Sequence, residues 1–121
     1  MSLVNPSLGR SYQLKIDKPL LDSFKTSKKI KLANSILCYK TNYIDHSRLG
    51  IQISKKAVKL SVVRNLVRRI IREDFRQNIA EFNKIDLLIL ITHKISSKNM
   101  KISDILIEEW KQSKSLLKNL L

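Results

Sequence analysis

The sequence predicts a single α/β domain, built as an α+β sandwich with elements in the order α-β-β-α-β-α. At 121 residues, of which 43% are hydrophobic, the chain is long enough to bury a core. Residues 35–40 and 48–54 have the short apolar or alternating pattern of strands, and residues 86–92 are continuously apolar, as expected for a central strand buried on both faces. Apolar residues at helical spacing precede, separate and follow these strands, which favours helices packed on a small sheet.

The predicted domain spans residues 1–121 and begins with an irregular arm. Residues 1–10 contain proline and glycine and show no hydrophobic period. A helix is then expected to begin after Asp17, whose carboxylate can cap it, and Pro19 fits its first turn because no N–H donor is needed there. The polar and basic residues 26–29 are expected to end this helix.

Two strands follow the first helix. Residues 35–40 are apolar and include a tyrosine, and residues 48–54 alternate between aliphatic and small or polar side chains. The connecting residues 42–47 are rich in Asn, Asp and Ser, which favour turns. The simplest prediction is a β-hairpin that pairs these two strands.

The second half of the chain predicts a helix, the central strand and a last helix. The first of these helices is expected to start at Ser61, as its cap, and to reach residue 79 or 82. Strand, helix and strand in this order imply a crossover connection. Ser103 is predicted to cap the last helix, in which Trp110 serves as a core anchor rather than a platform for stacking bases.

The helix after Ser61 has one cationic and one apolar face. At about 100° per residue, four arginines fall in one row, and Asn65 and Arg69 lie beside it. The row consists of Arg64, Arg68, Arg72 and Arg76. The opposite face carries Val63, Leu66, Val67, Ile70 and Ile71. This pattern predicts a helix that rests on the core and exposes guanidinium groups.

The arginine row is interpreted as a surface for nucleic acid. Like charges at this spacing destabilise a helix by a few tenths of a kcal/mol for each pair. A solvated charged face usually mixes signs, whereas this helix has only Glu73 and Asp74 as acids. Arginine also suits bidentate phosphate contacts. A polyanionic partner would remove the repulsion, so we prefer this interpretation to a solvated face.

The charge of the whole chain supports the same interpretation. The sequence has 24 Lys and Arg against 10 Asp and Glu, a formal net charge of +14. Residues 48–76 alone contain nine basic and two acidic residues, which is half of the net charge in under a quarter of the chain. Lys55, Lys56 and Lys59 extend the predicted surface ahead of the helix. Concentrated positive charge on a compact fold predicts a phosphate-bearing partner.

Other features argue against several functional classes. No apolar run approaches the ~20 residues of a membrane span, so no membrane partner is expected. Cys38 is the only cysteine and no signal peptide is visible, which favours the reducing cytoplasm. His46 and His93 lack ligand-like neighbours, and no catalytic constellation is apparent. We therefore expect neither a metal site nor a catalytic residue in this chain.

The basic stretch resembles the conserved motif of the bacterial ribonuclease P protein subunit. That family carries Lys-Lys, a short basic spacer, Arg-Asn-Arg, Lys/Arg-Arg and Arg-Glu-x-Phe-Arg. The matching residues are Lys55-Lys56, Lys59, Arg64-Asn65, Arg68-Arg69 and Arg72-Glu73-Asp74-Phe75-Arg76. The resemblance extends over roughly residues 14–117. Two positions depart from the pattern, because Leu66 replaces an arginine of the triad and Leu20 replaces a frequent phenylalanine.

The resemblance implies an α/β sandwich with a left-handed β-α-β crossover, an exception to the usual right-handed rule. It also implies a protein that binds a catalytic RNA, one protein per RNA, and assists Mg²⁺-dependent removal of the 5′ leader from precursor tRNA. The RNA, not this chain, would hold the active site and need the Mg²⁺. The implied RNA-binding residues are Lys55, Lys56, Lys59, Arg64, Asn65, Arg68, Arg69, Arg72 and Arg76.

The resemblance further implies a cleft for the single-stranded leader, between the first helix and the sheet. Its residues would be Leu20, Phe24, Ile36 and Tyr39, with the two aromatic rings able to stack on unpaired bases. The alternative role of both rings is packing in the core.

Two other functions fit part of the sequence. A non-enzymatic ribosomal or ribosome-assembly RNA-binding protein would share the charge, size and fold class but would not require the Lys-Lys to Arg-Glu-x-Phe-Arg motif. A DNA-binding module would place the arginine helix in a major groove. Only Asn65, beside the row, is suited to read a base edge there, which argues against DNA.

Overall fold

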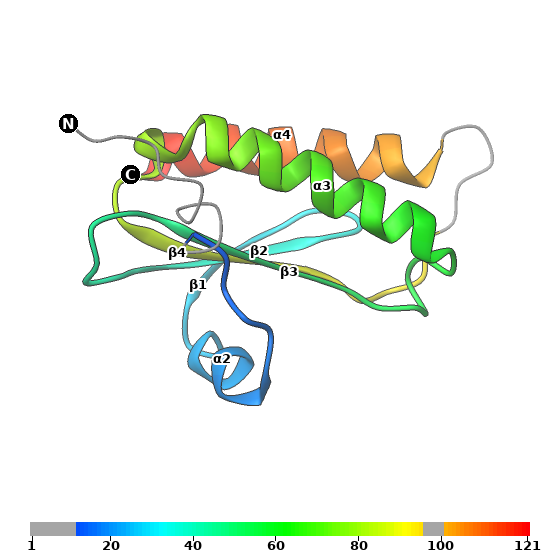
Figure 1. Cartoon of the computed structure of the whole chain (residues 1–121), viewed down its shortest axis with the longest axis horizontal. Helices are drawn as coiled ribbons and strands as arrows, with labels where there is room; N and C mark the ends of the chain where they lie inside the picture. Colours follow the sequence, from blue (N-terminus) through cyan, green and yellow to red (C-terminus); the bar gives the residue numbers. More distant parts are fainter. Residues whose placement is uncertain (1–11, 96–100) are drawn as a thin grey trace.

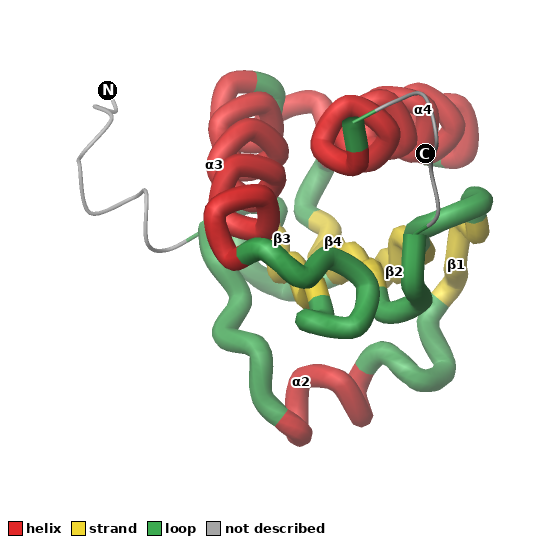
Figure 2. The backbone as a smooth tube through the Cα atoms, turned by 90° about the vertical axis from the view of Figure 1, so that its right-hand side faces the viewer, coloured by secondary structure: helices red, strands yellow, loops and turns green. Residues whose placement is uncertain are grey.

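The computed structural model describes residues 12–95 and 101–121, which form a four-stranded sheet between two helical layers (Figure 1). The helices are α2 (Lys18–Ser23), α3 (Ser61–Gln77) and α4 (Ile102–Leu120), and a 3-10 turn, η1 (Ile79–Phe82), follows α3. The strands are β1 (Lys28–Lys31), β2 (Ile36–Thr41), β3 (Arg48–Ile53) and β4 (Ile85–Ile91). Figure 2 shows α3 and α4 side by side on one face of the sheet and α2 on the other. The predicted α/β sandwich is confirmed.

The sheet has the strand order β1-β2-β4-β3, so the predicted hairpin of β2 with β3 is wrong. β4 lies between them, antiparallel to β2 and parallel to β3. Hydrophobic patterning identified β2, β3 and β4 as strands but not the strands with which they pair. β4 is buried along nearly its whole length, and the centre of the sheet is the only place that covers both of its faces.

β1 is a strand that the sequence analysis missed. Its residues Lys28–Lys31 include three lysines and are mostly exposed, and the sequence predicts residues 26–29 only as the polar end of the first helix. The segment pairs antiparallel with β2 at the edge of the sheet. Backbone hydrogen bonds, rather than side-chain burial, make it a strand, and exposed lysines are common on edge strands because they prevent further pairing.

The start of α2 follows the prediction, whereas other helix ends differ. Asp17 Oδ1 accepts a hydrogen bond from the Leu20 amide at 2.9 Å, and Pro19 lies in the first turn. The helix ends at Ser23, earlier than expected. Ser61 and Ser103 are not caps. α3 starts one residue earlier than expected, at Ser61 itself, and α4 starts two residues earlier, at Ile102, so Leu60 and Lys101 occupy the cap positions without a side-chain cap.

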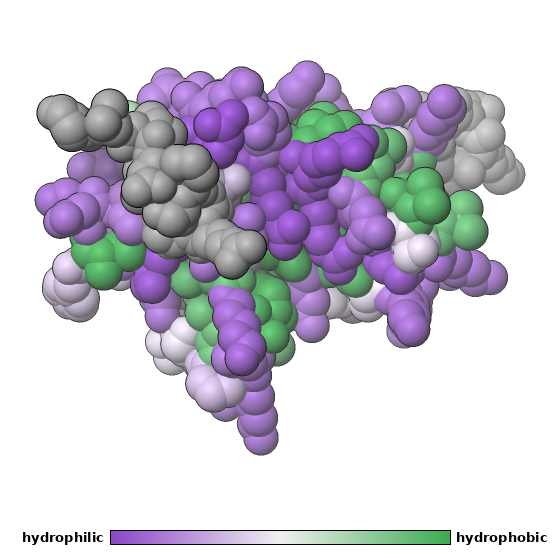
Figure 3. Space-filling model, in the orientation of Figure 1, coloured by the Kyte–Doolittle hydropathy of each residue, from purple (hydrophilic) through white to green (hydrophobic). Residues whose placement is uncertain are grey.

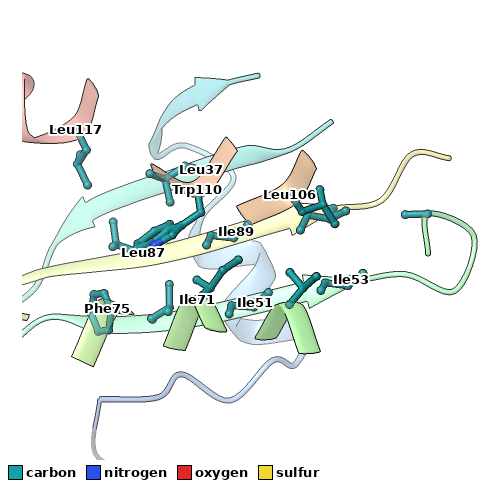
Figure 4. Close-up of a cluster of buried hydrophobic side chains, with 14 of the residues drawn as sticks. Leu37, Ile51, Ile53, Ile71, Phe75, Leu87, Ile89, Leu106, Trp110 and Leu117 are labelled. Atoms are coloured by element: carbon teal, nitrogen blue, oxygen red, sulfur yellow. The ribbon is translucent and has the colours of Figure 1, made fainter. Parts of the chain in front are cut away.

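The main core fills the space between the sheet and the α3–α4 layer (Figure 4). Phe75 of α3 and Trp110 of α4 are 0% and 3% exposed, which confirms Trp110 as a core anchor. An aromatic chain runs from Tyr12 through Phe75 and Phe82 to Trp110, with centroid separations of 5.8, 5.1 and 6.2 Å. These rings connect the sheet edge, α3, η1 and α4 into one packed unit.

A smaller core lies on the other face of the sheet. Phe24, Cys38 and Leu88 form its centre, and α2 covers it. The segment before α2 crosses β3 at Gly50, where an added Cβ would lie only 2.9 Å from Ile16 Cδ1. Glycine leaves room here for the side chains of Ile16 and Leu14, which any added side chain would crowd.

The edge of β3 is covered rather than free. The Leu14 amide donates to the Leu49 carbonyl at 2.9 Å, and the Leu49 amide donates to the Tyr12 carbonyl at 2.7 Å. This short parallel pairing prevents β3 from pairing with another chain. The expected crossover unit is formed by β3, α3 and β4, and its left-handed sense stays a prediction. The predicted irregular arm at residues 1–10 lies outside the described residues.

None of the helices in residues 12–95 and 101–121 combines the length and hydropathy needed to cross a membrane.

Asp74 connects α3 to α4. Its Oδ2 accepts hydrogen bonds from Trp110 Nε1 and from Lys114 Nζ, both at 2.7 Å. Partial burial raises the pKa of the Asp74 carboxyl, but the hydrogen bonds from Lys114 and Trp110 and the lysine charges outweigh this effect, so the pKa is lowered. The ionised carboxylate therefore stabilises the fold.

This contribution should appear in the pH dependence of stability. It is fully present above the unfolded pKa of Asp, about 4, and is lost as the pH falls through the lower folded pKa. Asp74→Asn should lower the free energy of unfolding at pH 7 by about 1–3 kcal/mol and flatten its decline at acid pH. Urea unfolding at several pH values measures both effects. The exposed Glu108→Gln is the matched control, and a parallel pH profile for Asp74→Asn and the unmodified chain would contradict this role.

Candidate nucleic-acid interface

The candidate interface is the outer flank of α3 with the loop that precedes it. Val67, Ile71 and Phe75 of α3 are buried against the sheet, whereas Leu66 and Ile70 are only half-buried. The apolar stripe is thus confirmed for Val67 and Ile71 but is centred closer to Phe75 than predicted. Leu66 lies on the flank away from the arginine row, as expected from its position on the helix.

The arginine row occupies one exposed flank of α3. Arg64, Arg68 and Arg72 are half-buried, as expected for long side chains that rest on the protein and keep their charged ends in solvent. Asn65 and Arg69, beside the row, are exposed. Figure 3 shows hydrophilic side chains gathered over the middle of this helix, with smaller hydrophobic patches beside them. The structure therefore brings the predicted helical residues together on one surface.

Arg64 also positions the loop that carries the lysines. Its Nη1 donates to the carbonyls of Val58 and Lys59, each at 2.8 Å. Ala57 and Val58 are buried and anchor the loop from below. Lys55, Lys56 and Lys59 are exposed. Sequence reasoning assigned only phosphate binding to Arg64 and missed this second role, because carbonyl acceptors in a loop leave no pattern in the side chains.

The charges of the row differ along the helix. Partial burial and the neighbouring charges of Arg72 and Arg64 lower the pKa of Arg68, whose Nη1 donates to Asn65 Oδ1 at 3.2 Å. Arg76 instead pairs with Glu73, and that hydrogen bond raises the pKa of Arg76. Positive charge is therefore concentrated at the middle of the row and is partly neutralised at its C-terminal end.

Seven of the predicted cations lack an acidic partner. Within residues 12–95 and 101–121, no ion pair involves Lys55, Lys56, Lys59, Arg64, Arg68, Arg69 or Arg72. Their mutual repulsion remains uncompensated inside the protein, and a row of phosphates would relieve it. By contrast, Arg48 forms a bidentate pair with the buried Asp86 at 2.9 and 2.7 Å, so this cation of the basic stretch serves the fold.

The four residues of the predicted leader cleft do not line one surface. Leu20, Phe24 and Ile36 meet on the α2 face, where they pack with Cys38 and Leu88. Tyr39 packs against the main core on the opposite face. Neighbouring residues of a strand point to opposite faces, so Ile36 and Tyr39, three positions apart, cannot share one. The period of two along β2 was the signal that could have separated them.

Phe24 is held in the smaller core. It is 2% exposed, and the ammonium of Lys40 lies 4.6 Å from the centroid of its ring. Lys40 Nζ also donates to the Ser23 carbonyl at 3.3 Å. The packing role of Phe24 is thus observed, and stacking on a base would require this contact to open. Within the described residues, no group of three or more His, Cys, Asp or Glu side chains is placed to bind a metal.

Comparison with known proteins identifies the family of this chain. Residues 8–116 match the Ribonuclease P family. The ribonuclease P protein component of Clostridioides difficile is 35% identical over 97 residues, which cover 80% of this chain and 84% of that protein. The component of Azotobacter vinelandii is 40% identical over 77 residues, or 63% of this chain and 59% of that protein. Several other relatives match over only about half of their length or less, for example 38% for Pseudomonas savastanoi.

Solved structures share the fold. The RNase P protein of Staphylococcus aureus superposes with a TM-score of 0.70 at 24% identity, covering 87% of this chain and 94% of that one. The RNase P protein of Thermotoga maritima superposes with a TM-score of 0.64 at 26% identity, covering 88% and 96%. With its fold, its cationic α3 and a family match over nearly the whole length, the chain belongs to the Ribonuclease P family of proteins.

Proposed function

We propose that this chain is the protein subunit of a ribonuclease P ribonucleoprotein and assists endonucleolytic removal of the 5′ leader from precursor tRNA. The observation that carries the proposal is the uncompensated cationic surface of α3 and its loop, in a chain that belongs to this family. The protein binds one catalytic RNA through this surface, one protein per RNA. The RNA holds the active site, and this chain supplies no catalytic residue.

Electrostatics explain how such a subunit helps. Bringing precursor tRNA against a catalytic RNA crowds phosphates of both molecules, and a protein of net charge +14 offsets that repulsion. Mg²⁺, which the ribonucleoprotein needs for hydrolysis, offsets the same repulsion. The protein should therefore lower the Mg²⁺ concentration at which the complex works. The buried cysteine, Cys38, suits the reducing cytoplasm in which we place this reaction.

The contribution of α3 is testable through the salt dependence of binding. If about six to eight phosphates are neutralised, affinity for the catalytic RNA should fall about 10³-fold between low and moderate salt. Arg68→Ala combined with Arg72→Ala should weaken binding and reduce the slope of log affinity against log salt by about two. Filter binding at several salt concentrations measures this slope.

The matched control removes two exposed cations away from α3, Lys101→Ala at the residue before α4 and Lys111→Ala within α4, which changes the net charge equally. Equal slopes for the two double variants would show that overall charge, not the α3 surface, governs binding.

The whole function is tested by cleavage of precursor tRNA with the cognate catalytic RNA at low Mg²⁺. Adding the protein should restore cleavage at the mature 5′ end, and the protein alone should cleave nothing. If the RNA is active at high Mg²⁺ but the protein gives no help at low Mg²⁺, the alternative of a non-enzymatic ribosomal or ribosome-assembly protein takes precedence.

A further inference from the structure

Two aliphatic side chains are exposed where the lysine-bearing loop meets α3. Leu60 is 67% exposed and Val62 is 76% exposed. Within residues 12–95 and 101–121, they are the only large hydrophobic side chains of this loop and of α3 that are exposed rather than half-buried or buried. Figure 3 shows hydrophobic side chains at the end of the molecule where α3 begins, beside hydrophilic ones. We call Leu60 and Val62 the apolar tip.

The residue at the cap position of α3 is unfavourable for the protein on its own. Leu60 has extended dihedral angles, φ −81° and ψ 124°, and makes no side-chain hydrogen bond to the first turn. Serine, threonine, asparagine or aspartate would accept such a bond and stabilise the helix. A serine would do so without adding negative charge, so attraction to phosphates does not explain the leucine. The missing cap and the exposed leucine both disfavour the free protein at one position, which points to a partner that contacts this leucine.

The apolar tip is held in a fixed position. The Leu60 carbonyl accepts hydrogen bonds from the amides of Val63 and Arg64, both at 3.1 Å. Arg64 Nη1 also donates to the carbonyls of the two residues before Leu60, each at 2.8 Å. The tip is therefore preorganised, and contact with a partner would require little further ordering of the backbone.

The charges around the apolar tip identify the kind of partner. The three exposed lysines of the loop precede it and the arginine row follows it, and the first turn of α3 contains no acidic residue. At a rise of 1.5 Å per residue, Leu60 lies about 6 Å along the helix axis from Arg64 and about 12 Å from Arg68. A partner that covers the tip therefore also meets these cations, so it carries phosphates on both sides of an apolar surface. In RNA that surface is a nucleobase, and the face of a base is accessible to a side chain where the base is unpaired.

We propose that the apolar tip packs on an unpaired base of the catalytic RNA, next to the phosphates that the lysines and arginines bind. The proposal rests on the proposed function in taking the catalytic RNA as the partner. Phosphate contacts alone do not distinguish one RNA helix from another. An apolar contact at one end of α3 restricts the interface to places where an RNA helix is interrupted by an unpaired nucleotide.

The double variant Leu60→Ser with Val62→Thr separates this contact from charge and from folding. Serine at the cap position should accept a hydrogen bond from the first turn and raise the melting temperature by about 2–5 °C. Affinity for the cognate catalytic RNA should nevertheless fall about tenfold at every salt concentration, because the apolar contact is lost while the number of neutralised phosphates is unchanged. Filter binding over a salt series measures both the affinity and its salt slope.

The matched control is Leu116→Gln with Leu120→Gln, which removes two exposed leucines from α4. Its affinity for the catalytic RNA should equal that of the unmodified protein. Unchanged affinity in the tip variant, or an equal loss in the tip variant and the control, would overturn the proposal. Binding to phosphatidylserine vesicles that the tip variant loses, with its RNA affinity unchanged, would assign the tip to a membrane surface instead.

Two short RNAs test whether the tip contacts an unpaired base. One is a fully paired hairpin, and the other is the same hairpin with a single bulged adenosine. The unmodified protein should bind the bulged hairpin more tightly, and the tip variant should bind both hairpins alike. The proposal fails if the unmodified protein shows no preference for the bulge, or if the tip variant retains that preference.

Failure here can be told apart from failure of the proposed function. If the unmodified protein restores precursor tRNA cleavage at low Mg²⁺ but the tip variant binds the catalytic RNA equally tightly, the tip is not a contact and the proposed function stands. If the protein gives no help in cleavage but the tip variant loses the preference for the bulged hairpin, the proposed function fails and base recognition by the tip stands.

Discussion

The fold depends on burying both faces of β4. Six of its seven residues are buried, and β2 and β3 flank it on either side. Each face then needs a cover, which α3 and α4 provide on one side and α2 with the segment before it provides on the other. At roughly 25 cal/mol for each Å² of apolar surface removed from water, this burial outweighs the local hairpin that the chain order suggests. The parallel pairing of β3 with β4 in turn requires a crossover, and α3 is that crossover.

The position of α3 makes its charge usable. A helix with several like charges on one flank is destabilised on its own, so the opposite side must hold it firmly. The helix is held by the buried side chains of Val67, Ile71 and Phe75. Asp74 also accepts hydrogen bonds from Trp110 and Lys114 of α4. The cationic flank is thus displayed on a rigid element, and binding a polyanion would cost little ordering of the backbone.

Features set by neighbouring residues, such as helix faces and a helix cap, were predictable from the sequence. The pairing of strands that are distant in the sequence was not. The spacing of Arg64, Arg68 and Arg72 fixed their common flank, because helical geometry alone determines it. The cap at Asp17 was predictable for the same reason. Three other features depend on how distant segments compete for the centre of the sheet. They are the pairing of β2 with β4, the existence of β1 and the face on which Tyr39 lies. The binding roles of the predicted surface and cleft residues stay predictions.

The cations of the basic stretch have two different roles. Some bind acceptors within the protein and so position the interface, and others are free to contact a partner. Arg48 and Arg64 are arginines with structural acceptors, a buried carboxylate and two loop carbonyls, which the planar and permanently charged guanidinium can bind at several points. A lysine at either place would provide one ammonium for the same acceptors and hold them less rigidly. Lys55, Lys56 and Lys59 instead stand in solvent, where a mobile point charge can adapt to phosphates of different spacing. The choice between arginine and lysine along this segment therefore follows the physical demand at each position, and net charge alone would not distinguish the two roles.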